Sequence, residues 1–522
     1  MKGALRLRKA ASLVIFVLAA CNSNGGQVAA VPPPGGVTAD ASRTETGVEL
    51  QTCERRNNDA FAKLEQCIQR RSLWQHLAQF QKIADAHPGP LGHGNRDTGT
   101  AGYKASVDYV ADMLHAAGYF VTIQQYFYGN SVPRGRPIFT IPGTTSTYDE
   151  DWFVARNSGD GNVVAQAEPP RRTTDGCAPG DFDGFRHGNI ALLARSDDCD
   201  VDSQVANAIA AGAAAVILYD GEPPPDGHGH QARLIDSVKV PVIGVTSNAI
   251  GNDLLQRYRR GDPARVHVAF HNKHRSDLDY NVIAESPYGD AQHTIVVEGH
   301  LDSIYGAGML DNASGSTTIL DLALAMAKTP TRNHLRFIWF GGEEIGLLGS
   351  KYYVSTLTQK ELRAIAFDVD VDVTATPNYD ITIAAAANAQ RAKHFPPNVV
   401  PQSRIGNDYF MQYFHDAGVI ARNNPGGSNG TDSLSFAYAG VPNTGILTQQ
   451  DCCKHRWETA LWGGFLGNYE GRIPSHNGGC VDYPGRWCDN LDNNDPFVLE
   501  LSSRAVAYVA FMLANRPHFP SR

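Results

Sequence analysis

The sequence predicts an α/β protein in which helices sandwich a mainly parallel or mixed sheet. Strand-like apolar segments alternate with amphipathic helical segments after residue 273, a pattern typical of a parallel sheet covered on both faces. With 522 residues, of which 42% are hydrophobic, the chain can bury a large core and has room for a second domain. That domain is predicted at residues 146–272, where a smaller α/β pattern interrupts the main one.

The first twenty residues predict an export signal. Four cationic residues precede an apolar run, Ala10–Ala20, that is too short to span a bilayer as a stable helix. The run ends Leu-Ala-Ala-Cys21 and resembles a bacterial lipobox, which implies a lipid anchor on Cys21; an ordinary secretory signal is the alternative. Residues 21–49 cannot bury themselves and predict a disordered tether. We therefore expect the protein in the cell envelope, on an outer membrane or cell surface, or secreted.

Cysteine usage agrees with an oxidising compartment. Apart from Cys21 the chain has eight cysteines, an even number. Three local pairings are plausible: Cys53–Cys67, Cys177–Cys199 and Cys480–Cys488. The adjacent Cys452 and Cys453 would bridge each other or pair elsewhere. Zinc–thiolate binding is disfavoured because no CxxC spacing occurs.

The charge balance argues against nucleic acids as partners. The formal net charge is −9, and the chain has no run of basic residues. Because binding to DNA or RNA depends on cationic side chains that face the phosphates, we exclude that class.

The elements of residues 50–145 follow from hydrophobic spacing. Apolar residues at helical intervals predict a helix through Leu73–Ile83 and a second one through Val107–Leu114, which Gly118 ends. A strand is predicted at Tyr119–Phe127, since apolar and polar residues alternate there. Helix followed closely by strand indicates an α/β layer.

The insert is predicted to contain three strands and a helix that passes through Val205 and Ile209. The strands are Asn189–Leu193, Ala213–Tyr219 and Val238–Val245. The stretch Gly-Asn-Ile-Ala-Leu from Gly188, with cysteines on either side, resembles a protease-associated domain, which is a small α/β insert of secreted peptidases.

The second part of the main domain, residues 273–522, resumes the larger pattern. Its predicted strands are Tyr280–Glu285, Thr294–Val297 and Leu335–Phe340, and its helices are Ser316–Lys328 and Phe497–Ala514. In such sheets the active crevice lies beyond the carboxyl ends of the strands. Ionisable residues follow two of these strands, and one more precedes a helix: His300, Asp302, Glu343, Glu344 and Asp311. Imidazole and carboxylate are zinc ligands, and one carboxylate can bridge two ions.

These segments resemble metallopeptidase family 28, the di-zinc aminopeptidases. The matching text is His300-Leu-Asp-Ser303, Asp311-Asn-Ala-Ser-Gly315 and Gly342–Ser350, and the likeness extends from about Leu73 to Ala514. The resemblance implies His300 as a ligand of one zinc ion, Asp311 as the bridging carboxylate and Glu344 as a ligand of the second. It implies Glu343 as the general base and Asp302 as the group that orients His300.

The fourth ligand is chosen among three aspartates, Asp368, Asp370 and Asp372. Matching the family's Ser-Pro-Asn on Thr376-Pro-Asn378 selects Asp372. With a period of two, all three carboxylates point to one face of the strand, which is costly unless a cation neutralises them.

The fifth ligand is where the chain departs from the family's Cys-Tyr-His-x-x-Cys-Asp segment. Counting from Trp462-Gly-Gly selects His476, whereas counting back from Cys488-Asp489 reaches a glycine, and His455 is the reserve. Ser475 stands where relatives place the tyrosine that binds the oxyanion, so that role is empty or belongs to Tyr469 or Tyr483. In addition, Thr431-Asp432-Ser433 replaces the usual Ser-Asp-His.

The resemblance implies an aminopeptidase with two zinc ions that acts on peptides or proteins. A carboxypeptidase would need a cationic clamp, for which Arg404, Arg422 and Arg456 are available. Two further hypotheses are a receptor of the same fold that has lost its metals and a single-zinc glutaminyl cyclase.

Overall fold

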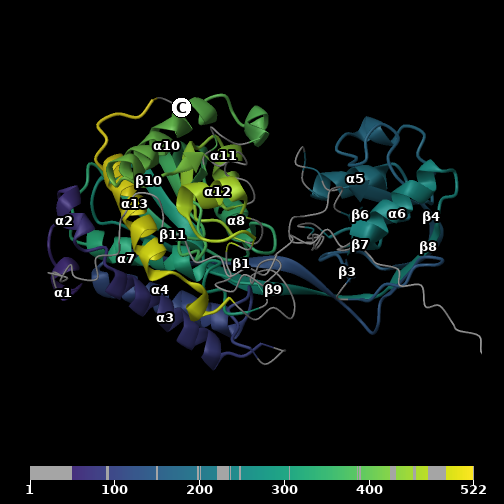
Figure 1. The fold of residues 1–522 in the computed structure, drawn as a ribbon, viewed down its shortest axis with the longest axis horizontal. Coiled ribbons are helices and arrows are strands. Elements are labelled where there is room, and N and C mark those ends of the chain that lie inside the picture. The colour runs from purple at the N-terminus through teal and green to yellow at the C-terminus, as the bar shows by residue number, and fades with distance from the viewer. Residues whose placement is uncertain are drawn as a thin grey trace, which may run out of the picture.

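The computed structural model describes most of the chain from residue 50 onward. The described residues are 50–89, 93–148, 151–194, 196, 199, 201–219, 234, 237–245, 248–304, 306–384, 386, 390–423, 431–450, 454–467, 469 and 489–520. The predicted lipobox with Cys21, the tether, and His476 lie outside them. Two sheets dominate the structure, a larger one among long helices and a smaller one beside it (Figure 1).

The larger sheet has eight strands in the order β1-β9-β11-β10-β12-β15-β13-β14. Their bounds are β1 Phe120–Pro133, β9 Asn272–Glu285, β10 Asp290–His300, β11 Asn333–Phe340, β12 Ile365–Val371, β13 Thr382–Ala384, β14 Arg422–Asn423 and β15 Asn443–Leu447. The centre is parallel, since β10 pairs in parallel with β11 and β12, and β12 with β15. Antiparallel pairs flank that centre on both sides. The predicted fold class is therefore confirmed.

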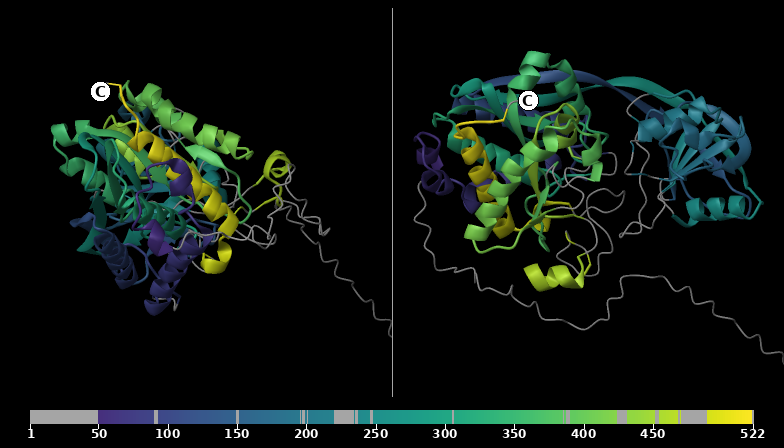
Figure 2. Two further views of the ribbon diagram at one scale, coloured as in Figure 1. Left: turned by 90° about the vertical axis from the view of Figure 1, so that its left-hand side faces the viewer. Right: turned by 90° about the horizontal axis from the view of Figure 1, so that it is seen from above.

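Helices cover both faces of this sheet (Figures 1 and 2). One face packs against α4 Ala101–Ala117, α7 Ala313–Met326, α10 Val399–Asp416 and α13 Pro496–Ala514, and α3 Arg70–Ala86 packs on the outside of α4, α7 and α13. The other packs against α8 Leu348–Thr356, α9 Gln359–Ala364 and α11 Ser433–Tyr438. The short helices α1 Leu50–Cys53, α2 Phe61–Glu65 and α12 Arg456–Trp462 complete this part. Among the described residues, α13 alone is long and apolar enough to cross a membrane, but most of it is buried in this core.

The smaller sheet has seven strands in the order β2-β8-β4-β5-β6-β7-β3. They are β2 Ile138–Thr140, β3 Trp152–Val154, β4 Gly161–Glu168, β5 Ile190–Ala194, β6 Ala215–Tyr219, β7 Val242–Val245 and β8 Arg265–Phe270, with helices α5 Val201–Ala210 and α6 Asn248–Arg259. Two predicted disulfides are confirmed: Cys177–Cys199 in this part and Cys53–Cys67 before α3. The remaining cysteines, 452, 453, 480 and 488, lie outside the described residues.

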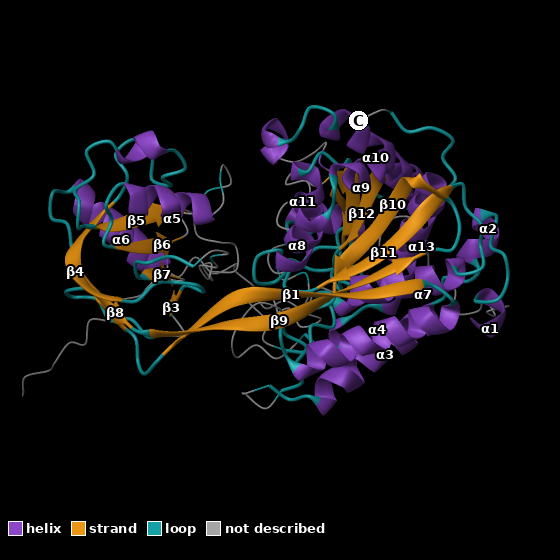
Figure 3. Cartoon of the chain, turned by 180° about the vertical axis from the view of Figure 1, so that it is seen from behind, coloured by secondary structure: helices purple, strands orange, loops and turns teal. Residues whose placement is uncertain are grey.

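Strands β1 and β9 form a ribbon that joins the two parts. They pair along their whole length, from Phe120 opposite Glu285 to Pro133 opposite Asn272. Figure 3 shows the ribbon running from the larger sheet to the smaller one. The sequence predicted shorter strands, because hydrophobic periodicity detects only strands that cover a core. Residues 272–279 are mostly polar, and backbone pairing with β1 holds them extended.

Candidate metal centre

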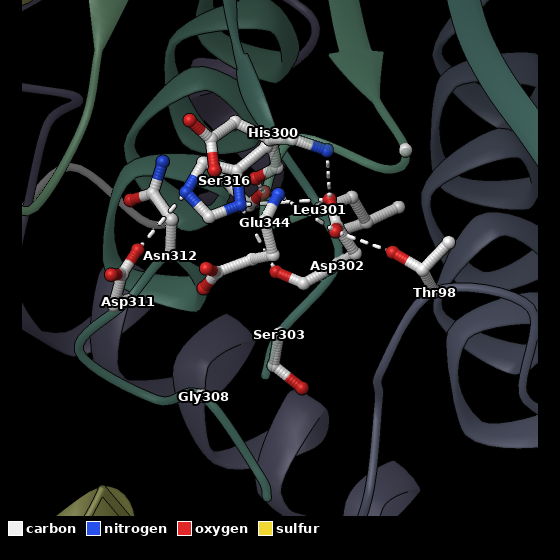
Figure 4. Close-up of polar contacts among 12 residues, drawn as sticks. Thr98, His300, Leu301, Asp302, Ser303, Gly308, Asp311, Asn312, Ser316 and Glu344 are labelled. Carbon is white, nitrogen blue, oxygen red and sulfur yellow. Dashed lines mark hydrogen bonds and ion pairs between the residues drawn. The ribbon is translucent and has the colours of Figure 1, made fainter. Parts of the chain in front are cut away.

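Parallel strand ends bring the predicted residues together. His300 is the last residue of β10, Asp372 directly follows β12, and Glu343 and Glu344 follow β11. Because these three strands are parallel neighbours, their carboxyl ends lie at one edge of the sheet. Asp311 reaches the same point from the residues that precede α7 (Figure 4).

Two overlapping groups of ligand atoms share His300. Within each group the ligand atoms lie no more than 4.8 Å apart: His300, Asp311 and Asp372 form one, and His300, Glu343 and Glu344 form the other. The His300 Nε2 atom lies 3.0 Å from Asp311 Oδ1 and 3.4 Å from Asp372 Oδ1. Carboxylates this close repel one another unless a cation lies among them, and one imidazole with several carboxylates is a donor set that Zn²⁺ accepts. The residues therefore fit zinc.

The electrostatics of the group are those of crowded, buried acids. Burial raises the pKa of the Glu343 carboxyl well above its ordinary value, and the charge of His300 offsets only part of this. Burial alone would lower the pKa of His300, but the carboxylates of Asp372, Asp302 and Asp311 raise it well above the usual value. Negative charge therefore dominates the site, which favours binding of a cation.

Asp302 supports the two glutamates as well as His300. Its backbone carbonyl lies 3.1 Å from His300 Nδ1, whereas its carboxylate is 3.6 Å from that atom. The carboxylate instead accepts the backbone N–H of Glu343 at 3.3 Å and of Glu344 at 3.4 Å. The hydroxyl of Thr98 also donates to it, at 2.6 Å (Figure 4). The sequence alone did not indicate Thr98, since nothing local marks a threonine 204 residues away as a partner.

Comparison with known proteins agrees with this geometry. Residues 281–509 match the family profile described as Peptidase family M28, and residues 160–254 match that of the PA domain. Residues 281–509 are thus an M28 peptidase domain, and a PA domain precedes them. The resemblance predicted from the motifs is thus confirmed for the family and for the insert.

Similar proteins span most of this chain. An aminopeptidase of Pseudomonas aeruginosa (strain UCBPP-PA14) is 29% identical over 470 residues, which cover 86% of this chain and 82% of that protein. The probable lipoprotein aminopeptidase LpqL of Mycobacterium tuberculosis is 28% identical over 457 residues, 85% of each chain. Among solved structures, the aminopeptidase from Aneurinibacillus sp. strain AM-1 has a TM-score of 0.64 at 20% identity and covers 89% of this chain and 98% of its own. The zinc aminopeptidase from Bacillus subtilis has a TM-score of 0.52 at 19% identity, covering 87% and 97%. These two structures share the fold.

Two residues to which the sequence motifs assign no role, Arg96 and Asp489, hold the loop before Asp311. The buried Arg96 donates to the backbone carbonyls of Leu301, Ala307 and Gly308 at 2.7 to 2.8 Å. Asp489 accepts the backbone N–H of Leu310 at 2.6 Å and of Asp311 at 3.2 Å. Both come from distant parts of the sequence.

Asn312 links the backbone segments of the two candidate aspartate ligands, Asp311 and Asp372. Its side-chain oxygen accepts the N–H of Val373 at 3.1 Å and caps α7 through the N–H of Gly315 at 2.9 Å. Its amide nitrogen donates to the carbonyl of Val371 at 2.9 Å. Asp311 directly precedes Asn312, and Asp372 lies between Val371 and Val373. The hydrogen bonds of Asn312 therefore hold the backbone of both aspartates together.

The three aspartates of the strand near the site occupy different surroundings. Asp368 and Asp370 lie within β12 and are buried, whereas Asp372 follows the strand and belongs to the ligand group. Asp370 accepts the hydroxyl of Thr431, and Glu298 lies opposite it on β10. Burial and the nearby charge of Asp372 raise the pKa of Asp370 to about 7.

The residues considered for the fifth ligand and for the oxyanion-binding group lie away from the ligand groups or outside the described part of the chain. His455 is exposed and directly precedes α12, where its backbone N–H donates to the carboxylate of Glu458. It belongs to neither ligand group. Tyr469 is buried and bonds through its hydroxyl to Glu458. His476 and Tyr483 lie outside the described residues.

Proposed function

We propose that this chain is an aminopeptidase that binds two zinc ions and releases N-terminal residues from peptides. The observation that carries the proposal is the sharing of His300 by two ligand groups at one sheet edge. His300 and Asp372 would hold one ion, Glu344 and His476 the other, and Asp311 would bridge them. When bound, zinc polarises the scissile carbonyl and lowers the pKa of water.

Glu343 is proposed as the general base and then the general acid. One glutamate of the pair is committed to the metal, and its neighbour stays free to move a proton. Glu343 is this free neighbour, and it lies in the same group of ligand atoms as His300 and Glu344. It would take the proton from the attacking water and deliver it to the leaving amine. Asp302 and Thr98 would keep the backbone of Glu343 in position for both transfers.

The surroundings support an aminopeptidase over a carboxypeptidase. The acids around the ligand groups suit a positively charged α-amino group. Of the three arginines available as a carboxylate clamp, Arg422 donates to Asp380 at 2.6 Å and to Glu458 at 3.3 Å. Arg404 and Arg456 have exposed side chains. Arg422 is thus already paired with acids of the same chain.

We also propose that the protein is exported and anchored through a lipid on Cys21. Two disulfides support the extracytoplasmic compartment. One relative, LpqL, carries the name of a probable lipoprotein. Labelling of cells with a radioactive fatty acid tests the anchor: wild type takes up label, and Cys21→Ser does not. Label in both proteins would contradict the assignment.

Hydrolysis of a panel of substrates tests the activity. The ectodomain from residue 22, loaded with zinc, is compared on aminoacyl-anilides and on the same compounds with a blocked amino group. We expect release from the free-amino substrates alone, loss of activity on chelation and recovery with added zinc. Hydrolysis from a free carboxyl end would favour the carboxypeptidase, and failure to retain zinc would favour a receptor without metals.

A further inference from the structure

Arg156 of the PA insert reaches the loop that carries both glutamates. It lies two residues after β3, and its Nη1 atom donates to the backbone carbonyl of Ile345 at 2.6 Å. Its Nη2 atom donates to the carbonyl of Gly129 on β1 at 3.1 Å, and its guanidinium lies over the ring of Tyr128, 5.1 Å from the centre. One side chain thus joins the insert, the β1–β9 ribbon and the residue that directly follows Glu343 and Glu344.

The backbone that bears Arg156 is fixed within the insert. Ala155, before it, is buried and donates its N–H to Val242 of β7 at 2.9 Å. Asn157, after it, is also buried and donates through its side chain to the carbonyl of Leu234 at 3.0 Å. Because both neighbours belong to the core of the insert, the place of the guanidinium is set by the insert as a whole.

The glutamate loop is held from the ribbon side as well. Ile345 packs against a small apolar cluster of Tyr126, Tyr128 and Leu348. The hydroxyl of Tyr126 donates to the carbonyl of Gly341 at 2.7 Å, at the start of the loop. A side chain at Gly342 is excluded, because φ is +66° there and a Cβ would lie 2.8 Å from that same hydroxyl. The β1–β9 ribbon therefore packs directly against the loop that carries both glutamates.

The backbone carbonyls of this loop have their donors in a regular order. Gly341 accepts from Gly349, Gly342 from Leu348, and Glu343 from Gly346 and Leu347, all at 2.8 to 2.9 Å. These bonds close the turn within the loop itself. The carbonyl of Ile345, in contrast, takes its bond from Arg156. The insert thus supplies a hydrogen bond that is not local to the turn bearing Glu343.

We propose that Arg156 is a positioning residue. Through it, the PA insert keeps Glu343 and Glu344 in the position in which Asp302 accepts their backbone N–H groups. The inference rests on the proposed function, in which Glu343 moves the proton. A displacement of about 1 Å in a reacting group can cost about a hundredfold in rate. Loss of the guanidinium should therefore lower kcat, while the ligand side chains remain and zinc is still bound.

The test compares Arg156→Ala and Arg156→Lys with a charge-matched control, Arg172→Ala. Arg172 lies in the same insert, but it is 65% exposed and pairs with Asp183 on the surface. We expect kcat of Arg156→Ala to fall about tenfold or more with KM changed less than about threefold. Lysine should be intermediate, because it keeps the cation over Tyr128 but lacks the two-armed fork. Added guanidinium should restore part of the rate of Arg156→Ala and should not affect the control.

Hydrogen exchange gives a readout that does not depend on activity. The amides of residues 343–349 should exchange faster in Arg156→Ala than in wild type, whereas those of β10 and of the control should not change. Unchanged exchange in this loop, or a kcat within twofold of the control, would overturn the proposal. An inactive wild type with faster loop exchange in Arg156→Ala would instead overturn the aminopeptidase assignment and leave the structural link intact. Unfolding midpoints of all three variants separate these outcomes from loss of the fold.

Discussion

The carboxylate of Asp489 accepts the backbone N–H of Asp311 at 3.2 Å, across 178 residues of sequence. It also accepts the N–H of Leu310, so one side chain holds two successive amides ahead of α7. Asp311 is the proposed bridging ligand, and its main chain is therefore anchored by a residue close to the start of α13. The second proposed ion would depend on the same stretch of chain, since His476 precedes Asp489 by only thirteen residues.

Asp489→Asn should weaken this anchor, because asparagine has one acceptor oxygen for two N–H donors. We expect zinc to be lost at about tenfold lower chelator concentration, with a comparable fall in kcat. Asp492→Asn removes the same charge from an exposed position nearby and should match wild type. Equal zinc retention in both variants would show that Asp311 does not need the Asp489 contact.

Glu343→Gln should abolish turnover but keep the metal. Glutamine has nearly the same shape and cannot take a proton, so we expect kcat to fall by about 10³ or more with zinc per chain unchanged. Glu344→Gln should lose zinc as well as activity. Metal analysis and kcat on the same preparations check both, and loss of zinc from Glu343→Gln would mean that the two roles are exchanged.

Thr98→Val should slow catalysis, although the Thr98 hydroxyl bonds to Asp302 and not to a proposed metal ligand. The hydroxyl of Thr98 donates to Asp302, which holds the amides of the glutamate pair. A hydrogen bond to a charged group contributes about 1.5–3 kcal/mol, so its loss should lower kcat by about tenfold to a hundredfold. Thr98→Ser keeps the hydroxyl and should retain most of the activity. Equal rates for serine and valine would show that side-chain shape matters there and the bond does not.

His476→Ala decides the fifth ligand. Two zinc ions per chain should fall to about one, whereas His455→Ala should keep both, because His455 is exposed and apart from the ligand groups. Elemental analysis of purified protein is the measurement. The opposite pattern would assign the ligand to His455.

Asp321 of α7 should make stability fall as pH rises. Burial raises its pKa to about 7 in the folded protein from an ordinary 3.8. The unfolded chain releases the proton near pH 4 and the folded protein only near pH 7, so the free energy of unfolding decreases between those values, by at most about 4 kcal/mol. Asp321→Asn should remove this slope and be the more stable protein at pH 8. Denaturant unfolding at pH 5 and pH 8 checks it, with exposed Asp112→Asn as the control.

Much of the candidate site was predictable because each part has a local signature. His300, Asp311 and the Glu343–Glu344 pair stand in short motifs at element ends, and helical or strand spacing locates those ends. The disulfides Cys53–Cys67 and Cys177–Cys199 were also predictable, since each closes a short loop. The role of Asp302 was predictable only in part. Its proximity to His300 follows from the sequence, but the backbone N–H groups of Glu343 and Glu344 that its carboxylate accepts lie about forty residues further along the chain.

By itself, the sequence determined the fold class, the resemblance to peptidase family M28 and the set of candidate ligands, because these depend on periodicity and on residues close together in the chain. Only the tertiary structure decided which distant residues support that set. Three hydrogen bonds each join segments more than 170 residues apart: Thr98 donates to Asp302, Asp311 to Asp489 and Arg156 to Ile345. A hydrogen bond of this kind needs a donor and an acceptor about 3 Å apart and leaves no pattern along the chain. Folding alone brings such atoms together.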